Sequence, residues 1–370
     1  MAELTIPQEL LPHDGRFGSG PSRVSSAQLD HLVRNASLLG TSHRQAPVKE
    51  LVARIQGALA AFFRLPEGYQ VVLGNGGSTA FWDVAAASLA RNRSAHLSFG
   101  EFGEKCVKAH TTPWLEAPHV IRSEPGSRGE LTAVAGADVY AWPHNETSTG
   151  VMAPVARVAG ADDGALMVVD ATSAAGGLDF DATQMDVYYF APQKNFASDG
   201  GLWFALMSPA ACERADEIAS TGRYIPEFLN LQVALENSRQ HQTLNTPALA
   251  TLLLMEAQLE WMMSAGGLSS VAAHCQETST LLYDWADSRN DVTPFVSAPE
   301  HRSHVVVTLD LDETLDATRV TSVLRANGIV DTEPYRKLGR NQIRIATFAG
   351  VPTTDVTRLI SSLDFVLENL

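Results

Sequence analysis

The sequence is poor in cysteine and contains no long apolar run. Its 370 residues include three cysteines, at positions 106, 212 and 275, and no CxxC motif. We therefore expect neither a disulfide framework nor a zinc ribbon. The most apolar stretches, such as residues 249–255, are too short to cross a bilayer, and the amino-terminal residues lack the basic and apolar regions of a secretory signal. These absences predict a soluble, cytoplasmic protein.

Positive charge is also scarce. The chain has 27 Lys and Arg residues against 42 Asp and Glu residues, which gives a formal net charge of −15. Binding to a phosphate backbone or an anionic membrane depends on clustered Lys and Arg, so neither is expected as the main partner. The same balance, taken at face value, also disfavours small anionic ligands. The content of 45% hydrophobic and 19% charged residues is typical of a globular protein.

Several common catalytic and ligand-binding motifs are missing as well. The sequence has neither a G-x-G-x-x-G fingerprint nor a P-loop, which disfavours a dinucleotide or ATP site. It has no HExxH motif, no clustered His and Cys residues and no G-x-S-x-G elbow. The single HxxH, residues 301–304, is interpreted as structural, so no metal is expected.

Short apolar runs alternate with helical patterns from residue 69 onward. Many of these runs lack polar alternation, as strands buried on both faces do, and a helical segment at 79–90 separates the first two. The pattern predicts an α/β domain with a mostly parallel sheet. The expected strands are 69–73, 95–99, 139–142, 165–169, 187–190 and 202–207.

The pattern of predicted strands and helices changes after a long predicted helix. Thr246 and Pro247 resemble an N-cap and a first helical residue, and the glycines at 266 and 267 would end that helix. Strands at 304–309 and 342–348, a helix at 317–327 and an amphipathic carboxyl-terminal helix follow. We therefore expect an amino-terminal arm, a large domain and a small α+β domain, at residues 1–20, 21–267 and 268–370.

Polar segments follow several predicted strands, at the edge where open α/β sheets bind ligands. Residues 74–79 (GNGGST) form a glycine-rich turn that opens a helix, and such a turn can hold a phosphate. It can equally be a tight connection. Residues 143–150 follow a later strand, where a hydrogen-bonded loop and a ligand site are about equally plausible.

Asp170 and Lys194 are expected to lie near the predicted phosphate site, although a phosphate site alone requires neither of them. Asp170 ends one buried strand, and Lys194 lies just past the next. A lone strand-end Asp is usually a helix cap, and a lone loop Lys is usually solvated. Together with a phosphate cradle, however, they match the needs of pyridoxal phosphate, whose aldehyde takes a lysine and whose ring nitrogen takes a carboxylate.

At this point the sequence resembles a known family over nearly its whole length. It resembles the phosphoserine aminotransferases, in the form typical of actinobacteria, within the fold-type I pyridoxal-phosphate enzymes. The resembling motifs, in chain order, are 17–22 (FGSGPS), 40–45 (GTSHRQ), 74–77 (GNGG), 144–147 (HNET), 170–173 (DATS), 191–195 (APQKN), 245–247 (NTP) and 327–331 (NGIVD). The resemblance implies a large domain with a mostly parallel, mixed sheet between helices and a smaller carboxyl-terminal α+β domain.

The resemblance also assigns cofactor-binding roles. Lys194 would form the Schiff base, Asp170 would partner the pyridinium nitrogen, and Thr147 would bind the ring hydroxyl. Phe102 would stack on the ring, where many relatives have Trp. Residues that would hold the cofactor phosphate are Gly77, Ser78, Thr79 and Gln193, with Asn245 and Thr246 reaching in from the neighbouring subunit of a homodimer.

Arginines dominate the substrate side that the resemblance implies. Arg344 would bind the α-carboxylate, for which a bidentate guanidinium is well suited. The other expected substrate residues are Ser19, His43, Arg44, Arg336 and Arg340. Many relatives have an arginine in the glycine-rich turn, where this chain has Ser78 or Thr79, so the residues that complete a distal phosphate site stay open.

The reaction that the resemblance implies is a ping-pong transamination of 3-phosphohydroxypyruvate with L-glutamate, in which Lys194 moves the proton. Use of 3-hydroxy-4-phosphooxy-2-oxobutanoate in vitamin B6 synthesis is a further implication. The alternatives are another class-V-like enzyme, such as serine–glyoxylate aminotransferase or cysteine desulfurase, and a non-catalytic protein that binds a phosphorylated ligand through its glycine-rich turn.

Overall fold

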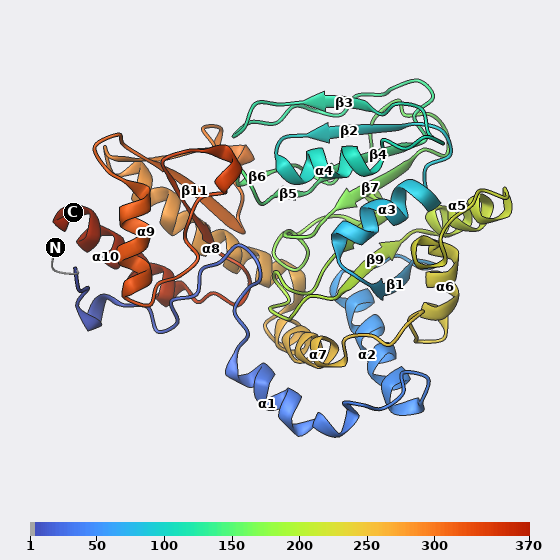
Figure 1. Cartoon of the computed structure of the whole chain (residues 1–370), viewed down its shortest axis with the longest axis horizontal. Coiled ribbons are helices and arrows are strands. Elements are labelled where there is room, and N and C mark those ends of the chain that lie inside the picture. Colours follow the sequence, from blue (N-terminus) through green and yellow to red (C-terminus); the bar gives the residue numbers. More distant parts are fainter. Residues whose placement is uncertain (1–3) are drawn as a thin grey trace.

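A computed structural model describes residues 4–370, and its elements form a larger and a smaller unit joined along the middle of the molecule (Figure 1). The α-helices are α1 (Ser26–Arg34), α2 (Ala46–Phe62), α3 (Ser78–Ser88), α4 (Glu101–Ala109), α5 (Pro209–Ser220), α6 (Leu231–Arg239), α7 (Leu249–Ser264), α8 (Gly267–Asp287), α9 (Ala317–Ala326) and α10 (Thr353–Asn369). Short 3₁₀ helices lie at Gln8–Leu10, Ala36–Leu38, Ala182–Gln184, Glu227–Leu229, Pro299–His301 and Arg336–Leu338.

The larger unit is built on a seven-stranded sheet with the order β1-β9-β8-β7-β4-β2-β3. Its strands are β1 (Gln70–Asn75), β2 (Ser94–Ser98), β3 (His119–Arg122), β4 (Val139–Pro143), β7 (Leu166–Asp170), β8 (Val187–Phe190) and β9 (Leu202–Met207). Only β9 runs against its neighbours β1 and β8, and the remaining pairs are parallel. The prediction of an α/β fold with a mostly parallel sheet is confirmed.

Helices cover both faces of this sheet, which explains why its strands are apolar without alternation. Along β7, Leu166 and Val168 belong to one buried cluster with α3, α4, α5 and α6, whereas Met167 and Val169 belong to another with α2 and α7. Successive side chains of a strand point to opposite faces. Asp170 therefore follows Val168 onto the face that α3 covers.

The smaller unit contains an antiparallel sheet of β10 (Val292–Pro294), β11 (Val306–Leu311) and β12 (Gln342–Ala346), with α8, α9 and α10 packed around it (Figure 1). The strands β5 (Asn145–Glu146) and β6 (Val151–Met152) form a separate hairpin. A second core lies in this smaller unit and draws on residues 282–367. The division into domains at residue 267 stays a prediction, because the core of the larger unit also includes Leu268, Val271 and Phe348.

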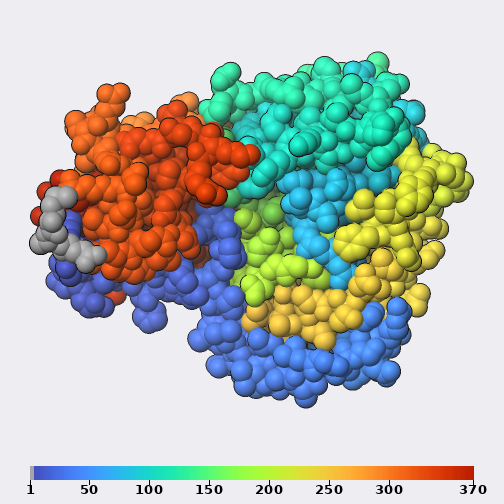
Figure 2. Space-filling model, viewed as in Figure 1, coloured from blue at the N-terminus to red at the C-terminus, as the bar shows by residue number. Residues whose placement is uncertain are grey.

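The amino-terminal segment is packed rather than a free arm. Ile6 and Phe17 are 2% and 1% exposed and belong to the core of the smaller unit. Backbone bonds join residues 15–17 to Val330 and Ala346. In Figure 2 the blue residues accordingly lie against the orange and red unit and in the seam beside it. Residues 1–3 of the predicted arm lie outside the described residues, and residues 4–20 are packed although their Pro and Gly residues suggested otherwise, because those signals do not show whether the apolar residues between them are buried.

The start of α7 also differs from the prediction. The helix begins at Leu249, and its N-cap is Ala248 rather than Thr246. The side chain of Asn75 accepts a hydrogen bond from the Asn245 N–H and donates one to the Thr246 carbonyl. These bonds hold residues 245–246 against the glycine-rich turn, so the backbone enters the helix only afterwards.

Phe63 tests how much the core between α2 and the sheet stabilises the fold. Its ring is fully buried, with ring centroids of Phe62, Tyr188 and Phe190 at 5.1, 5.9 and 5.8 Å. Phe63→Ala leaves a cavity and should cost about 3–5 kcal/mol of unfolding free energy. Urea titration of both variants measures this. The half-exposed Trp114 is the control, and Trp114→Ala should cost less than about 1 kcal/mol of unfolding free energy. Equal effects would contradict the burial.

Candidate active site

The carboxyl ends of β1, β4, β7 and β8 meet around a cavity of about 170 Å³. In Figure 2 the yellow-green residues near 190 are visible between the cyan helix α3 and the blue amino-terminal segment. The cavity is lined by Gly77, Ser78, Thr79, Trp82, Phe102, Pro143, Asn145, Thr147, Asp170, Thr172, Gln193 and Lys194. Most of the predicted cofactor residues are in this set.

Asp170 is the last residue of β7, and its side chain is buried, with two hydrogen-bond donors on one of its oxygens. The backbone N–H and the hydroxyl of Thr172 donate to Oδ1 at 2.9 and 2.5 Å, and the indole N–H of Trp82 donates to Oδ2 at 2.7 Å. Burial raises the pKa of the Asp170 carboxyl, and these donors act in the opposite direction. The carboxylate is thus placed to meet a cationic ring nitrogen.

Lys194 faces Asp170 from the loop after β8. Its Nζ donates to the Ser19 carbonyl at 2.6 Å. Burial lowers the pKa of Lys194 to about 8, and the nearby charge of Arg344 acts in the same direction, against the effect of Asp170. An amine with this pKa is partly neutral near physiological pH, which is the state that attacks an aldehyde.

The start of α3 has the features of a phosphate site. Gly77 is the N-cap and supplies no side-chain cap, and a Cβ there would meet nothing within 4 Å. Within residues 4–370, the buried atoms Ser78 Oγ and Gln193 Oε1 have no hydrogen-bond partner. Free helix N–H groups and the unpaired Ser78 hydroxyl are donors that fit an anion at this end of the cavity. The residues present therefore fit pyridoxal phosphate.

Glu146 fixes the aromatic side of the cavity. It is fully buried, and its Oε2 accepts the backbone N–H groups of Phe102 and Gly103 at 3.1 and 3.0 Å. Its Oε1 accepts from Ser148. Burial raises the pKa of the Glu146 carboxyl, and these hydrogen bonds lower it. The carboxylate anchors the first turn of α4 and thereby holds Phe102 at the cavity.

Arg344, on β12 of the smaller unit, is not in the cavity lining but contacts Thr147, which is. Its neighbours Ile343 and Ile345 point into the core, so Arg344 lies on the opposite face of the strand. Its Nη1 donates to the Thr147 carbonyl at 3.1 Å, and its guanidinium lies 5.5 Å from the Tyr335 ring centroid. Its buried Nε has no partner among the described residues. Part of the guanidinium is thus available to a carboxylate.

Four predicted residues lie together at the surface, outside the cavity lining. His43 is 3.3 Å from the Thr246 hydroxyl, and Arg44 donates to Gln242 at 3.1 Å. Asn245 and Thr246 are exposed beside the glycine-rich turn. The structure brings these residues into one group on the same chain.

Arg336 and Arg340 are exposed as well, and the structure does not bring them to the cavity lining. Arg340 forms an ion pair with Asp310 at 2.5 Å and lies over the Phe295 ring. Tyr335, just before Arg336, lies closer to the site, with its ring centroid 5.9 Å from that of Phe102.

Comparisons with known proteins decide the family. A family model described as aminotransferase class-V matches residues 130–332. A phosphoserine aminotransferase of a Nocardioides species is 58% identical over 370 residues, which is 99% of each chain. The one from Corynebacterium glutamicum is 52% identical and covers 98% of this chain and 97% of its own.

The chain belongs to the phosphoserine aminotransferase family. It is accordingly a pyridoxal-phosphate-dependent aminotransferase, as the cavity around Lys194 and Asp170 indicates. Of the known structures, a phosphoserine aminotransferase from Cytophaga hutchinsonii matches with a TM-score of 0.87 and 22% identity over 96% of this chain and 99% of its own. An alanine–glyoxylate aminotransferase from a Nostoc species reaches 0.79 with 18% identity over 98% of each chain. The fold is therefore shared across several aminotransferases and does not itself select the substrate.

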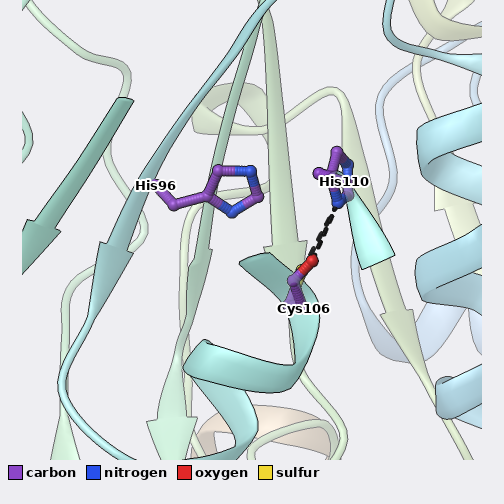
Figure 3. Close-up of side chains that lie close together, drawn as sticks. All are labelled: His96, Cys106 and His110. Carbon is purple, nitrogen blue, oxygen red and sulfur yellow. Dashed lines mark hydrogen bonds between the residues drawn. The ribbon is translucent and has the colours of Figure 1, made fainter. Parts of the chain in front are cut away.

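Behind Asp170 lies a buried polar layer that sequence spacing did not reveal. The side chains of His96, Cys106 and His110 come within 4.8 Å of one another (Figure 3). His96 Nε2 lies 2.8 Å from the Ser94 hydroxyl, and His110 Nδ1 lies 3.1 Å from the Cys106 carbonyl. Burial lowers the pKa of His110 to about 4 and raises that of the Cys106 thiol. The layer is thus neutral and packed against the α3 side of the sheet.

Sequence reasoning missed part of the site. Trp82, Pro143, Asn145 and Thr172 line the cavity, and Glu146 supports it from behind. Trp82 is one helical turn after Ser78, and Thr172 lies two residues after Asp170. Spacing from these predicted site residues could therefore have indicated both positions. The role of Glu146 was not, because it depends on the packing of β5 against α4.

Gly20 offers a test of the Lys194 position. It has φ +136°, and a Cβ there would lie 1.8 Å from Lys194 Nζ. Gly20→Ala should displace the amine and lower transaminase activity roughly 100-fold, because reacting groups tolerate little misplacement. The control is Gly57→Ala, whose Cβ meets nothing within 4 Å on α2. Steady-state rates and thermal unfolding of both variants check this, and full activity in Gly20→Ala would contradict the geometry.

Proposed function

We propose that this chain transfers the amino group of L-glutamate to 3-phosphohydroxypyruvate, giving O-phospho-L-serine and 2-oxoglutarate, as part of serine biosynthesis. The observation that supports this best is the set of buried polar atoms without partners around Lys194. Within residues 4–370 these are Ser19 Oγ, Ser78 Oγ, Asn145 Oδ1, Gln193 Oε1 and Arg344 Nε. Unpaired buried groups are costly, so a cluster of them favours a polar ligand set, in which Ser19, Ser78 and Arg344 can donate to anionic groups and the two amide oxygens can accept from ligand donors.

Pyridoxal phosphate, when bound, supplies an aldehyde that condenses with amines and a ring that accepts electrons. Lys194 would hold the cofactor and, once displaced by the amino substrate, would move a proton between the substrate carbon and the cofactor side. Lys194 is one of the residues that line the cavity. The low-dielectric surroundings keep the amine neutral enough to accept that proton.

The remaining cofactor residues would each bind a different part of the cofactor. Asp170 would keep the ring nitrogen protonated, and Thr147 would bind the ring hydroxyl. Phe102, held by Glu146, would cover the ring face. The phosphate would be held by Gly77, Ser78, Thr79 and Gln193.

The predicted substrate residues would lie between the cavity and the surface. Arg344 would take the α-carboxylate through the donors that Thr147 leaves free. Ser19, His43, Arg44 and Arg336 would serve the more distal groups. Arg340 would first have to leave Asp310 before it could reach a substrate. The same distal group would accept the longer phosphorylated oxo acid of the vitamin B6 route.

A homodimer with shared sites is part of the proposal. Asn245 and Thr246 are exposed beside the glycine-rich turn, as residues that reach a neighbouring subunit would be. Large apolar side chains are also exposed, including Val33 at 73%, Tyr224 at 89% and Phe228 at 46%. Burial of such groups against a second copy would be favourable.

The alternatives receive less support from this chain. A desulfurase needs a reactive cysteine on an accessible loop, whereas Cys106, Cys212 and Cys275 are all buried and Cys275 lies on α8. The location of the protein is also part of the proposal. Among residues 4–370, no helix is long and apolar enough to span a membrane. A cytoplasmic location is proposed.

Replacement of the phosphorylated substrate tests the distal site. We expect half-reaction rates to fall by at least about 100-fold when hydroxypyruvate replaces 3-phosphohydroxypyruvate, because charged hydrogen bonds to the phosphate are lost. Arg44→Gln should reduce this discrimination. Arg340→Gln shows whether the arginine paired with Asp310 takes part. Equal rates for both oxo acids in stopped-flow measurements would contradict a distal phosphate site.

The pKa of Lys194 predicts how cofactor capture depends on pH. The amine loses its proton as pH rises through about 8. When pyridoxal phosphate is added to the apo-protein, the rate of increase in visible absorbance should therefore rise with pH and reach a plateau above that value. Arg344→Gln removes a positive charge that lowers this pKa, and the midpoint should move to higher pH. Arg344→Lys keeps the charge and is the control. A midpoint unchanged in Arg344→Gln would contradict the coupling.

A further inference from the structure

Trp82 makes a contact that the assigned roles do not use. It lies on α3, four residues after Ser78, and its indole N–H donates to Asp170 Oδ2 at 2.7 Å. Both side chains are buried, with Trp82 5% and Asp170 7% exposed. A hydrogen bond between a neutral donor and a buried carboxylate is stronger than one between neutral groups.

The carboxylate of Asp170 is nearly saturated by donors from this chain. Thr172 supplies two donors to Oδ1, and Trp82 supplies one to Oδ2. An ionised carboxylate has about four acceptor positions. Against the effect of burial, the Tyr189 side chain also lowers the pKa of this carboxylate, so little of its acceptor capacity is left for a donor from a ligand, and the indole defines the direction of Oδ2.

The helix that carries Trp82 is packed against the sheet beside Asp170. The preceding residue, Phe81, stacks on Tyr189 with a centroid distance of 4.5 Å and meets Trp203 edge-on at 5.0 Å. Tyr189 is the strand neighbour of Asp170 in the β7–β8 register. Helix α3 is thus packed on the strand that flanks the carboxylate, and its first turn lines the proposed phosphate end of the cavity.

We propose that Trp82 is a positioning residue for the cofactor's ring nitrogen: its indole N–H holds the Asp170 carboxylate in place and keeps it ionised. The proposal rests on the assignment of Asp170 to that nitrogen. Because Ser78 and Trp82 share one helix, the phosphate end and the nitrogen end of the cavity are set by a single rigid element. Loss of the N–H would leave Oδ2 short of a donor, so Asp170 would more readily take the proton from the ring.

The test compares two cofactors in Trp82→Phe, which removes the N–H and keeps an aromatic body. The probes are pyridoxal phosphate and its 1-deaza analogue, which has carbon in place of the ring nitrogen. Trp82→Phe should weaken binding of pyridoxal phosphate to the full-length apo-protein roughly tenfold or more relative to the analogue. With ¹⁵N-labelled cofactor, the ring-nitrogen NMR signal should move toward that of neutral pyridine. kcat should fall more than KM for glutamate changes.

Trp285→Phe is the matched control, because that indole also donates to a carboxylate, Asp364, at 2.8 Å in the smaller unit. It should leave the affinity ratio of the two cofactors unchanged. If Trp82→Phe lowers both affinities equally and leaves the ¹⁵N signal in place, Trp82 only packs and the proposal is overturned. Should Trp82→Phe fail to fold, the tryptophan isostere with sulfur in place of the indole N–H, at position 82 alone, makes the same comparison.

Asp170→Asn separates failure of this inference from failure of the proposed cofactor role. It should abolish the preference for pyridoxal phosphate over the 1-deaza analogue. If Asp170→Asn has no such effect, the assignment of Asp170 itself is wrong. If Asp170→Asn abolishes the preference but Trp82→Phe does not reduce it, only the role of Trp82 is wrong.

Discussion

The parallel pairing of β7 with β8 is the constraint on which the site depends. Asp170 ends β7 opposite Tyr189 of β8, so the loop that carries Lys194 leaves the sheet at the same edge. Both strands are buried on both faces, and a slip of one residue would send Asp170 to the side of α2 and α7. The indole of Trp82 and the N-terminus of α3 would then face an apolar side chain. The register therefore decides whether a carboxylate, an amine and a helix start can share one cavity.

The second requirement is closure by segments that are remote in the chain. Lys194 bonds to the Ser19 carbonyl, and the Phe17 carbonyl accepts the Ala346 N–H. Arg344, on the same strand as Ala346, bonds to the Thr147 carbonyl. The amino-terminal segment and β12 thus contact the site as one packed body. This explains why the burial of Ile6 and Phe17 in the smaller unit matters for the chemistry.

Net charge proved a poor guide to the ligand. A balance of −15 disfavours nucleic acid, yet the family's cofactor and the proposed substrates are anions. Net charge describes the whole surface, whereas recognition depends on a few groups in a cleft. Here those groups are Arg344, Lys194 and the start of α3. Burial brings the pKa of Lys194 to about 8, which an exposed lysine would not have.

The sequence by itself determined six of the seven strands of the large sheet, the α/β class and the motif residues, because buried strands and strand-end polar groups have local signatures, whereas β3 was not predicted. Val187–Phe190 and Leu202–Met207 were predicted with the bounds that the structure has, and Asp170, Lys194 and the glycine-rich turn lie together as expected. Only the tertiary structure decided that Trp82 and Glu146 support the site, that Arg340 pairs with Asp310 and that α7 begins after Pro247. Each of these depends on contacts between segments far apart in the chain, which residue spacing does not encode.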